Sequence, residues 1–210
     1  MAKHTIKQGD CIESIAFEKG FFWETIWNLP ENADLKRIRK NPNALLSGDK
    51  VFLPEKQEKE VPCATEKKHR FRQKGVPSML NIILEDQEDQ PLANISYVLE
   101  IDGHTYTGHT DKEGRLRQTI PPNAQKGMLY IGENRERQYP LELGHIDPIT
   151  EVSGIQGRLN NLGFECGAIN GLLNDETRAA IRQFQLKYGL EESGEPDQNT
   201  RDKIKEVYGN

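Results

Sequence analysis

Residues 155–190 read IQGRLNNLGFECGAINGLLNDETRAAIRQFQLKYGL, and this stretch decides the fold of the C-terminal part of the chain. Apolar residues recur at helical spacing in its first third, which predicts an amphipathic helix. The apolar face of this helix comprises Val152, Ile155, Leu159 and Leu162. Ser153 and Gln156 have the spacing of a capping box at its start, and Gly163 is a typical stop.

The rest of the stretch predicts another amphipathic helix after a turn at Asn170-Gly171. Either Asn174 or Asp175 caps this helix, and Gly189 ends it. A third apolar face follows near the C-terminus. These two faces comprise Ala180, Ile181, Phe184 and Tyr188, and then Thr200, Ile204, Val207 and Tyr208. The sequence therefore predicts a three-helix unit.

The order of these residues closely resembles the peptidoglycan-binding three-helix domain, to which we assign residues 146–210. The shared pattern runs Ile-Gln-x-x-Leu-x-x-Leu-Gly-Phe, Gly-x-x-Asn-Gly and Thr-x-x-Ala-Ile-x-x-Phe-Gln-x-x-x-Gly-Leu. The resemblance implies a glycan-binding groove formed by Gly163, Phe164, Asn170, Gly171, Phe184 and Gln185. Burial in the core is the alternative interpretation of Phe164 and Phe184.

Residues 1–54 form another unit, in which the predicted order is strand, helix, helix and strand. The strands are expected at residues 5–7 and 51–54, and the second helix at residues 23–29. Residues 34–40, which read DLKRIRK, are interpreted as a polar insertion before the last strand.

This order resembles the lysin-motif (LysM) domain, which has a βααβ fold. Residues 5–16 match its opening pattern, and residues 41–54 match its closing pattern. The resemblance implies that two loops recognise N-acetylated glycan. These loops comprise Gly9, Asp10, Cys11 and Ile12, and Asn43, Ala44, Leu45 and Leu46.

Residues 76–145 change to the two-residue period of β-strands. Six short strands separated by turn signals such as Asp102-Gly103 predict a small antiparallel β-sandwich. The run from Gln90 to Leu116 resembles the transthyretin-like, carboxypeptidase-regulatory type of sandwich. Residues 55–75 are charged and follow neither period, which predicts a linker. The chain as a whole is expected to be a multidomain α+β protein.

Composition and charge exclude several classes of protein. Of 210 residues, 35% are hydrophobic, which suits several small domains better than one thick core. The formal net charge of −5 provides no basic field for nucleic acid, and no run of apolar residues is long enough for membrane insertion. Three widely spaced cysteines argue against a disulfide scaffold and suit a reducing compartment.

The N-terminus has no apolar segment of the kind found in secretory signal peptides. We expect the protein to be cytoplasmic or to reach the periplasm or cell envelope by a signal-independent route. A signal sequence that was trimmed from the chain is the remaining alternative.

No catalytic constellation is visible in the sequence. The serines lie in no Gly-x-Ser-x-Gly motif, and the cysteines and histidines lack the spacing of a metal site. We therefore predict a non-catalytic protein without cofactor or metal, whose partner is peptidoglycan or its N-acetylated glycan strands.

Two alternatives remain. The chain also resembles accessory proteins of contractile injection systems of the type VI secretion kind, in which these domains would dock spike, baseplate or effector proteins. The other alternative is that the chain is the targeting region of a wall-cleaving enzyme whose catalytic part is absent or encoded separately.

Overall fold

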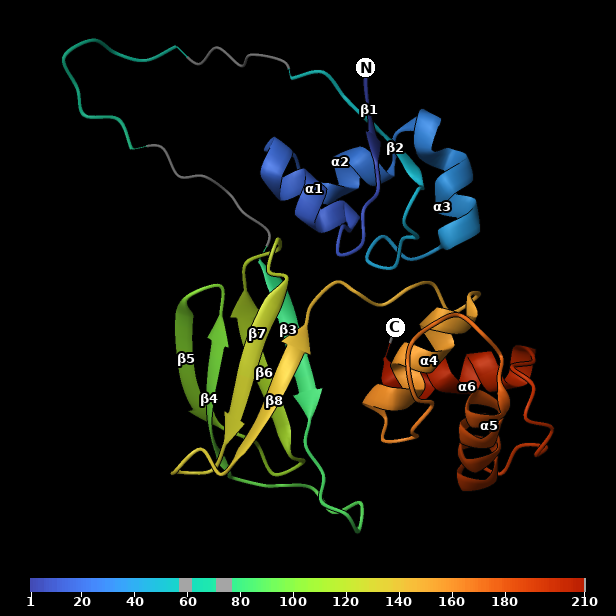
Figure 1. Cartoon of the computed structure of the whole chain (residues 1–210). Helices are drawn as coiled ribbons and strands as arrows, with labels where there is room; N and C mark the ends of the chain where they lie inside the picture. Colours follow the sequence, from blue (N-terminus) through green and yellow to red (C-terminus); the bar gives the residue numbers. More distant parts are fainter. Residues whose placement is uncertain (57–61, 71–76, 210) are drawn as a thin grey trace. The chain divides into compact units, whose positions relative to one another are not determined.

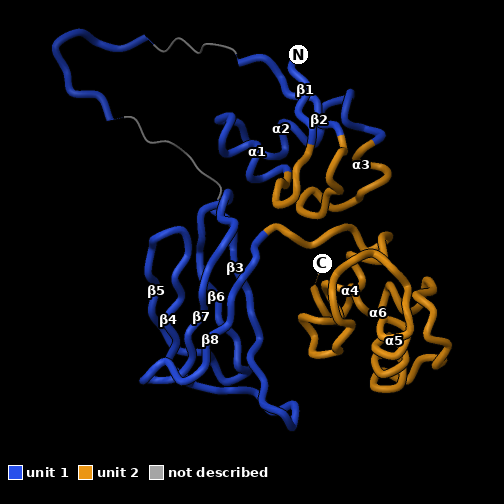
Figure 2. The backbone as a smooth tube through the Cα atoms, viewed as in Figure 1, with its two compact units in different colours: residues 1–5, 12–34, 50–143 blue, residues 6–11, 35–49, 144–210 orange. Residues whose placement is uncertain are grey.

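The computed structural model describes residues 1–56, 62–70 and 77–209 (Figure 1). Two compact units divide the chain, and each is described by itself (Figure 2). Unit 1 comprises residues 1–5, 12–34 and 50–143, and unit 2 comprises residues 6–11, 35–49 and 144–210. The predicted linker, residues 55–75, lies partly outside the described residues. In its described part, residues 62–70 have no helix or strand, and their side chains are exposed.

Unit 1 begins with an antiparallel pair of strands, β1 (Ala2–Thr5) and β2 (Lys50–Leu53). The helices α1 (Ile12–Lys19) and α2 (Trp23–Trp27) and a short 3-10 helix (Pro30–Asn32) lie between them in the sequence. The buried Asn32 joins α2 to β2, because its Nδ2 donates to the carbonyls of Ile26 and Phe52 at 2.8 and 2.9 Å. The backbone N–H of Phe52 returns a bond to Asn32 Oδ1 at 2.8 Å.

Two details of this region differ from the sequence prediction. The first strand covers residues 2–5 instead of 5–7, because its register is set by pairing with residues 50–53. The polar insertion is a helix, α3 (Ala33–Arg39). None of its residues is buried, so it has no apolar stripe that a periodicity search would detect. Its good helix formers, with an acidic first turn and a basic last turn, account for it.

The rest of unit 1 is built from two antiparallel sheets. The smaller sheet pairs β3 (Ser78–Ile83) with β6 (Arg115–Ile120). The larger sheet has the order β5-β4-β7-β8. Its strands are β4 (Ser96–Ile101), β5 (His104–His109), β7 (Lys126–Ile131) and β8 (Arg137–Glu142).

One hydrophobic core contains side chains from both sheets. Leu99 and Ile101 of β4 and Leu116 of β6 are completely buried in it, and Leu80 and Ile82 of β3 pack against it. The predicted two-residue period therefore corresponds to alternation between this core and solvent. The transthyretin-like resemblance of this region stays a prediction.

Unit 2 contains the three C-terminal helices, α4 (Val152–Asn161), α5 (Asp175–Lys187) and α6 (Gln198–Tyr208). Their apolar faces meet in a second core. Its fully or nearly buried members are Ile155, Leu159, Phe164, Cys166, Ala180, Ile181, Phe184 and Ile204. This agrees with the predicted helices and their faces. Together with the antiparallel sheets, these helices confirm the α+β class.

The helix starts differ in one respect from the prediction. Asn174 caps α5, since its Oδ1 accepts the backbone N–H of Thr177 at 2.9 Å. The expected capping box of α4 is wrong, because the N-cap residue is Glu151, which makes no side-chain cap bond. The Ser153 hydroxyl instead donates to Asp147 Oδ2 at 2.6 Å, and Gln156 is fully buried.

Candidate functional site

The side chain of Gln156 organises the loop between α4 and α5. Its Oε1 accepts the backbone N–H groups of Asn170 and Gly171 at 3.1 and 2.9 Å. Its Nε2 donates to Asn170 Oδ1, to the Leu172 carbonyl and to Thr177 Oγ1 at 2.9–3.1 Å. A fully buried carboxamide with this many bonds holds a short segment of backbone in one conformation.

A second glutamine does the same between α5 and α6. Gln185 is fully buried, and its Oε1 accepts the backbone N–H of Gly194 at 2.9 Å. Its Nε2 donates to Ser193 Oγ and the Glu195 carbonyl at 3.1 Å and to Thr200 Oγ1 at 2.9 Å. The two loops thus share one arrangement: a buried glutamine side chain bonds to the loop backbone, and the loop ends at the N-cap of the next helix.

The repeated loops differ in the surface that they present. In the first loop, Ile169 and Leu172 are 57% and 63% exposed, and Asn170 and Gly171 between them are also exposed. In the second loop, the exposed residues include Glu191, Glu192, Ser193 and Glu195. Residues 169–172 of the first loop are therefore uncharged and largely apolar, whereas the second loop is acidic.

Backbone geometry places the two apolar side chains of the first loop. Gly171 has a φ of +72°, a conformation that glycine adopts readily and that turns the chain between Asn170 and Leu172. Ile169 lies beside Gly157 of α4, since a Cβ atom built at Gly157 would be in ordinary van der Waals contact with Ile169 Cδ1, at 3.6 Å. We call the exposed set Ile169, Asn170, Gly171 and Leu172 the first-loop face.

The six C-terminal residues predicted to bind glycan do not form one surface. Gly163, Asn170 and Gly171 are exposed. The rings of Phe164 and Phe184 meet edge to face in the core, with centroids 5.4 Å apart, and Gln185 holds the second loop from inside. Gln156, Ile169 and Leu172 were not among the predicted site residues. The signal in the sequence that relates the two glutamine-centred loops is the spacing Gly-x-x-Asn/Asp-x-x-Thr, which occurs at residues 171–177 and 194–200.

The predicted N-terminal site is also divided between core and surface. Cys11, Ile12, Ala44 and Leu45 are buried, whereas Asn43 is exposed and Leu46 is half-buried. Gly9 is buried and Asp10 is half-buried. The backbone just before the first loop pairs with the backbone just after the second in unit 2. The N–H of Ile6 donates to the Asp49 carbonyl at 2.8 Å, and the N–H of Gly48 donates to the Ile6 carbonyl at 2.9 Å.

An ion pair fixes the second of these N-terminal loops. Arg39 Nε and Nη2 donate to both carboxylate oxygens of Asp49 at 2.7 and 2.9 Å. The same carboxylate accepts the backbone N–H of Leu46 at 3.0 Å. Burial alone would raise the pKa of Asp49, but the hydrogen bonds from Arg39 and Leu46 and the Arg39 charge outweigh burial and hold this pKa below its usual value.

The two buried cysteines do not resemble reactive nucleophiles. Cys11 and Cys166 are buried, Cys63 is exposed, and none is in a disulfide. Burial raises the pKa of the Cys166 thiol to about 11, which keeps it protonated near neutral pH.

Among the described residues, no cluster of three or more His, Cys, Asp or Glu side chains is arranged to hold a metal ion. A search of the described helices finds none whose length and apolar character would suffice to cross a membrane.

Comparison with known proteins bears on the C-terminal helices. Residues 149–204 match the family described as "Putative peptidoglycan binding domain". The chain is also 41% identical over 54 residues to a spore cortex-lytic enzyme of Oceanobacillus iheyensis. That match covers 26% of this chain and 20% of the enzyme. No solved structure matches significantly.

These findings support the peptidoglycan-binding resemblance and the association with cell wall. The first-loop face lies inside the matched region. The lysin-motif, transthyretin-like and secretion-system resemblances stay predictions.

Proposed function

We propose that this chain is a non-catalytic peptidoglycan-binding protein and that the first-loop face contacts the glycan. The observation that carries the proposal is the pair of exposed apolar side chains, Ile169 and Leu172, in a region that matches a peptidoglycan-binding family. N-acetylated sugars are neutral and amphipathic, and they suit an apolar surface beside backbone and amide groups. The second loop, which carries three exposed glutamates, offers no such surface.

Residues 43–46 would add a second glycan contact, through exposed groups such as Asn43. Two weak sites on one chain gain affinity when a single polymer spans both.

Sedimentation with purified insoluble peptidoglycan tests the proposal. The full chain is incubated with sacculi, and the bound fraction is measured for the wild type and for Ile169→Ser/Leu172→Ser. We expect the double variant to bind about tenfold more weakly, which corresponds to losing about 1.4 kcal/mol of apolar contact. Leu186→Ser is the matched control, because Leu186 is 63% exposed on α5 and lies outside the first-loop face.

Three results would contradict the proposal. Equal binding by the double variant and the control would remove the first-loop face from the site. A wild-type chain that stays in the supernatant would favour docking to a protein instead. Release of soluble muropeptides by the purified chain would overturn its non-catalytic character.

A further inference from the structure

The outer face of the β3–β6 sheet carries an unusual combination of side chains. Three residues of β3 lie directly opposite three residues of β6 in the antiparallel register. The opposed pairs are Met79 with Thr119, Asn81 with Arg117, and Ile83 with Arg115. All six residues are exposed, and we call them the β3–β6 face.

The apolar members of this face are not needed for the core. Leu80 and Ile82 of β3 point to the opposite side of the sheet, where they pack against the core shared by the two sheets. Met79 and Ile83 are 56% and 53% exposed. These two large apolar side chains lie four residues apart on the solvent side of β3, with Asn81 between them on the same face.

The two arginines make the β3–β6 face positively charged. Directly opposite side chains in an antiparallel pair have Cβ atoms about 5 Å apart, so Arg115 and Arg117 border the apolar pair. Among the described residues, no ion-pair partner is found for the guanidinium group of Arg115 or of Arg117. The chain as a whole has a net charge of −5, so the charge of the β3–β6 face is opposite in sign to that of the whole chain.

We propose that the β3–β6 face docks an acidic, extended segment of another protein. Its carboxylates would pair with the two arginines, which favour bidentate contact, and its apolar side chains would cover Met79 and Ile83. Within the described residues each of the two strands pairs only with the other, so both outer edges of the sheet have backbone groups for an extended chain to meet.

Two other occupants fit less well. A second copy of the face in a symmetric dimer would bring arginines against arginines. Nucleic acid would place phosphates against Met79 and Ile83 with only two cations to neutralise them.

The test selects peptides with the full chain. A phage-displayed library of random linear peptides is panned against the immobilised wild type, and the enriched peptides are measured by fluorescence anisotropy. We expect enriched sequences in which Asp or Glu alternates with apolar residues. Their affinity should fall at least about tenfold for Arg115→Gln/Arg117→Gln and for Met79→Ser/Ile83→Ser.

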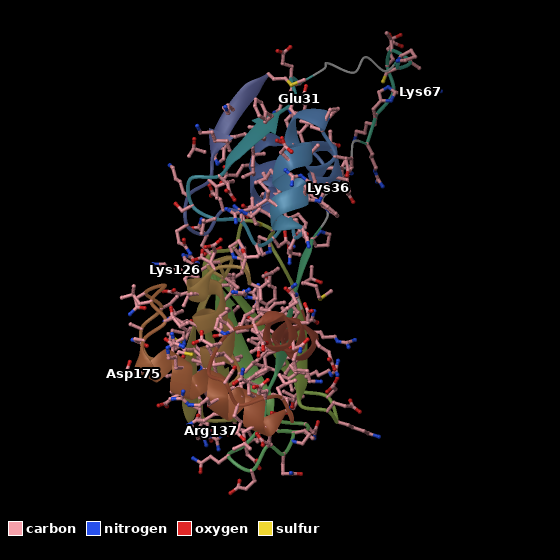
Figure 3. The ribbon with its side chains drawn as sticks, turned by 90° about the vertical axis from the view of Figure 1, so that its right-hand side faces the viewer. Glu31, Lys36, Lys67, Lys126, Arg137 and Asp175 are labelled. Carbon is pink, nitrogen blue, oxygen red and sulfur yellow. The ribbon has the colours of Figure 1, made fainter. Side chains whose placement is uncertain are left out.

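A matched control is available on the larger sheet. Lys126 and Arg137 are exposed strand residues at opposite ends of the β7–β8 pair (Figure 3). Lys126→Gln/Arg137→Gln removes the same charge and should leave peptide binding unchanged.

Any of three results would overturn the proposal. These are enrichment without an acidic pattern, equal loss in the control, and concentration-dependent self-association that the arginine variant abolishes. Peptidoglycan sedimentation should be the same for the arginine variant and the wild type, so this proposal and the proposed function fail independently.

Discussion

Gln156 and Gln185 perform the same task in two consecutive loops of the C-terminal unit. Each is fully buried and accepts a backbone N–H from a glycine, Gly171 or Gly194, while its Nε2 donates to a threonine hydroxyl in the next helix. Glycine, helix cap and threonine recur at the same spacing, as Gly171, Asn174 and Thr177 and as Gly194, Asp197 and Thr200. The two loops are therefore an internal repeat, and each is organised by one buried carboxamide, that of Gln156 or Gln185.

Replacing either glutamine by leucine should destabilise this unit strongly. Gln156→Leu keeps similar volume but leaves the N–H groups of Asn170 and Gly171 without their protein acceptor, at a cost of about 3 kcal/mol. Hydrogen exchange with mass spectrometry on the full chain measures this loss in α4 to α6. Gln183→Leu is the control, since Gln183 is exposed on α5. Unchanged protection in the Gln156 variant would refute the role given to the carboxamide.

The cap of α6 should make part of the stability depend on pH. Hydrogen bonds from the backbone N–H and the hydroxyl of Thr200 hold the pKa of Asp197 below its usual range. A carboxyl with a lowered folded-state pKa stabilises the fold above its unfolded pKa, near 4, and loses this contribution as the pH falls through its folded value.

Two substitutions separate the cap from the charge. Asp197→Ala should cost about 1 kcal/mol at neutral pH. Asp197→Asn keeps a cap of similar strength, so its difference from the wild type should change as the pH falls below about 4. The same exchange measurement on α6 at a series of pH values checks this. A pH-independent difference between Asp197→Asn and the wild type would contradict it.

The sequence predicted the helices and strands best where an apolar period was present. Ile155, Leu159, Phe184 and Ile204 were expected on buried faces and lie there. The helix α3 was missed because it buries no residue and so leaves no period.

The candidate site was harder to predict, for two physical reasons. Gln156 was interpreted as part of a capping box with Ser153, because the groups that bond to its side chain lie far along the chain, from Asn170 to Thr177. Ile169 and Leu172 were not singled out, because a sequence does not distinguish an exposed apolar side chain from a buried one. The structure locates both on the surface.

The three cysteines should differ sharply in reactivity. Cys63 is exposed, whereas Cys11 and Cys166 are buried, and burial raises the pKa of Cys166 to about 11. Since the thiolate is the reactive form, a maleimide should label the native chain rapidly at Cys63 alone. Cys63→Ser should abolish the rapid phase, and denaturant should expose the other two thiols. Rapid labelling of Cys166 in the native chain would show that the core of the C-terminal unit opens easily.

The Arg39–Asp49 pair should make the N-terminal part of the chain sensitive to acid. The pKa of Asp49 lies below its usual value, so its contribution to stability is present above pH 4 or so and is lost as the pH falls toward its folded value. Both side chains are largely buried, at 11% and 15% exposure. Asp49→Asn should therefore cost about 1–3 kcal/mol at neutral pH, as for hydrogen bonds to charged groups.

Tryptophan fluorescence of the N-terminal part of the chain checks this prediction. The chain has two tryptophans, Trp23 and Trp27, and both lie on α2. Denaturant titrations at several pH values should show the wild type weakening as the pH falls below about 4, while Asp49→Asn changes less. Glu18→Gln is the matched control, because it removes an exposed carboxylate of α1. If Asp49→Asn and the wild type weakened in parallel with acid, the acid sensitivity would come from other carboxylates, and the ion pair would not be its cause.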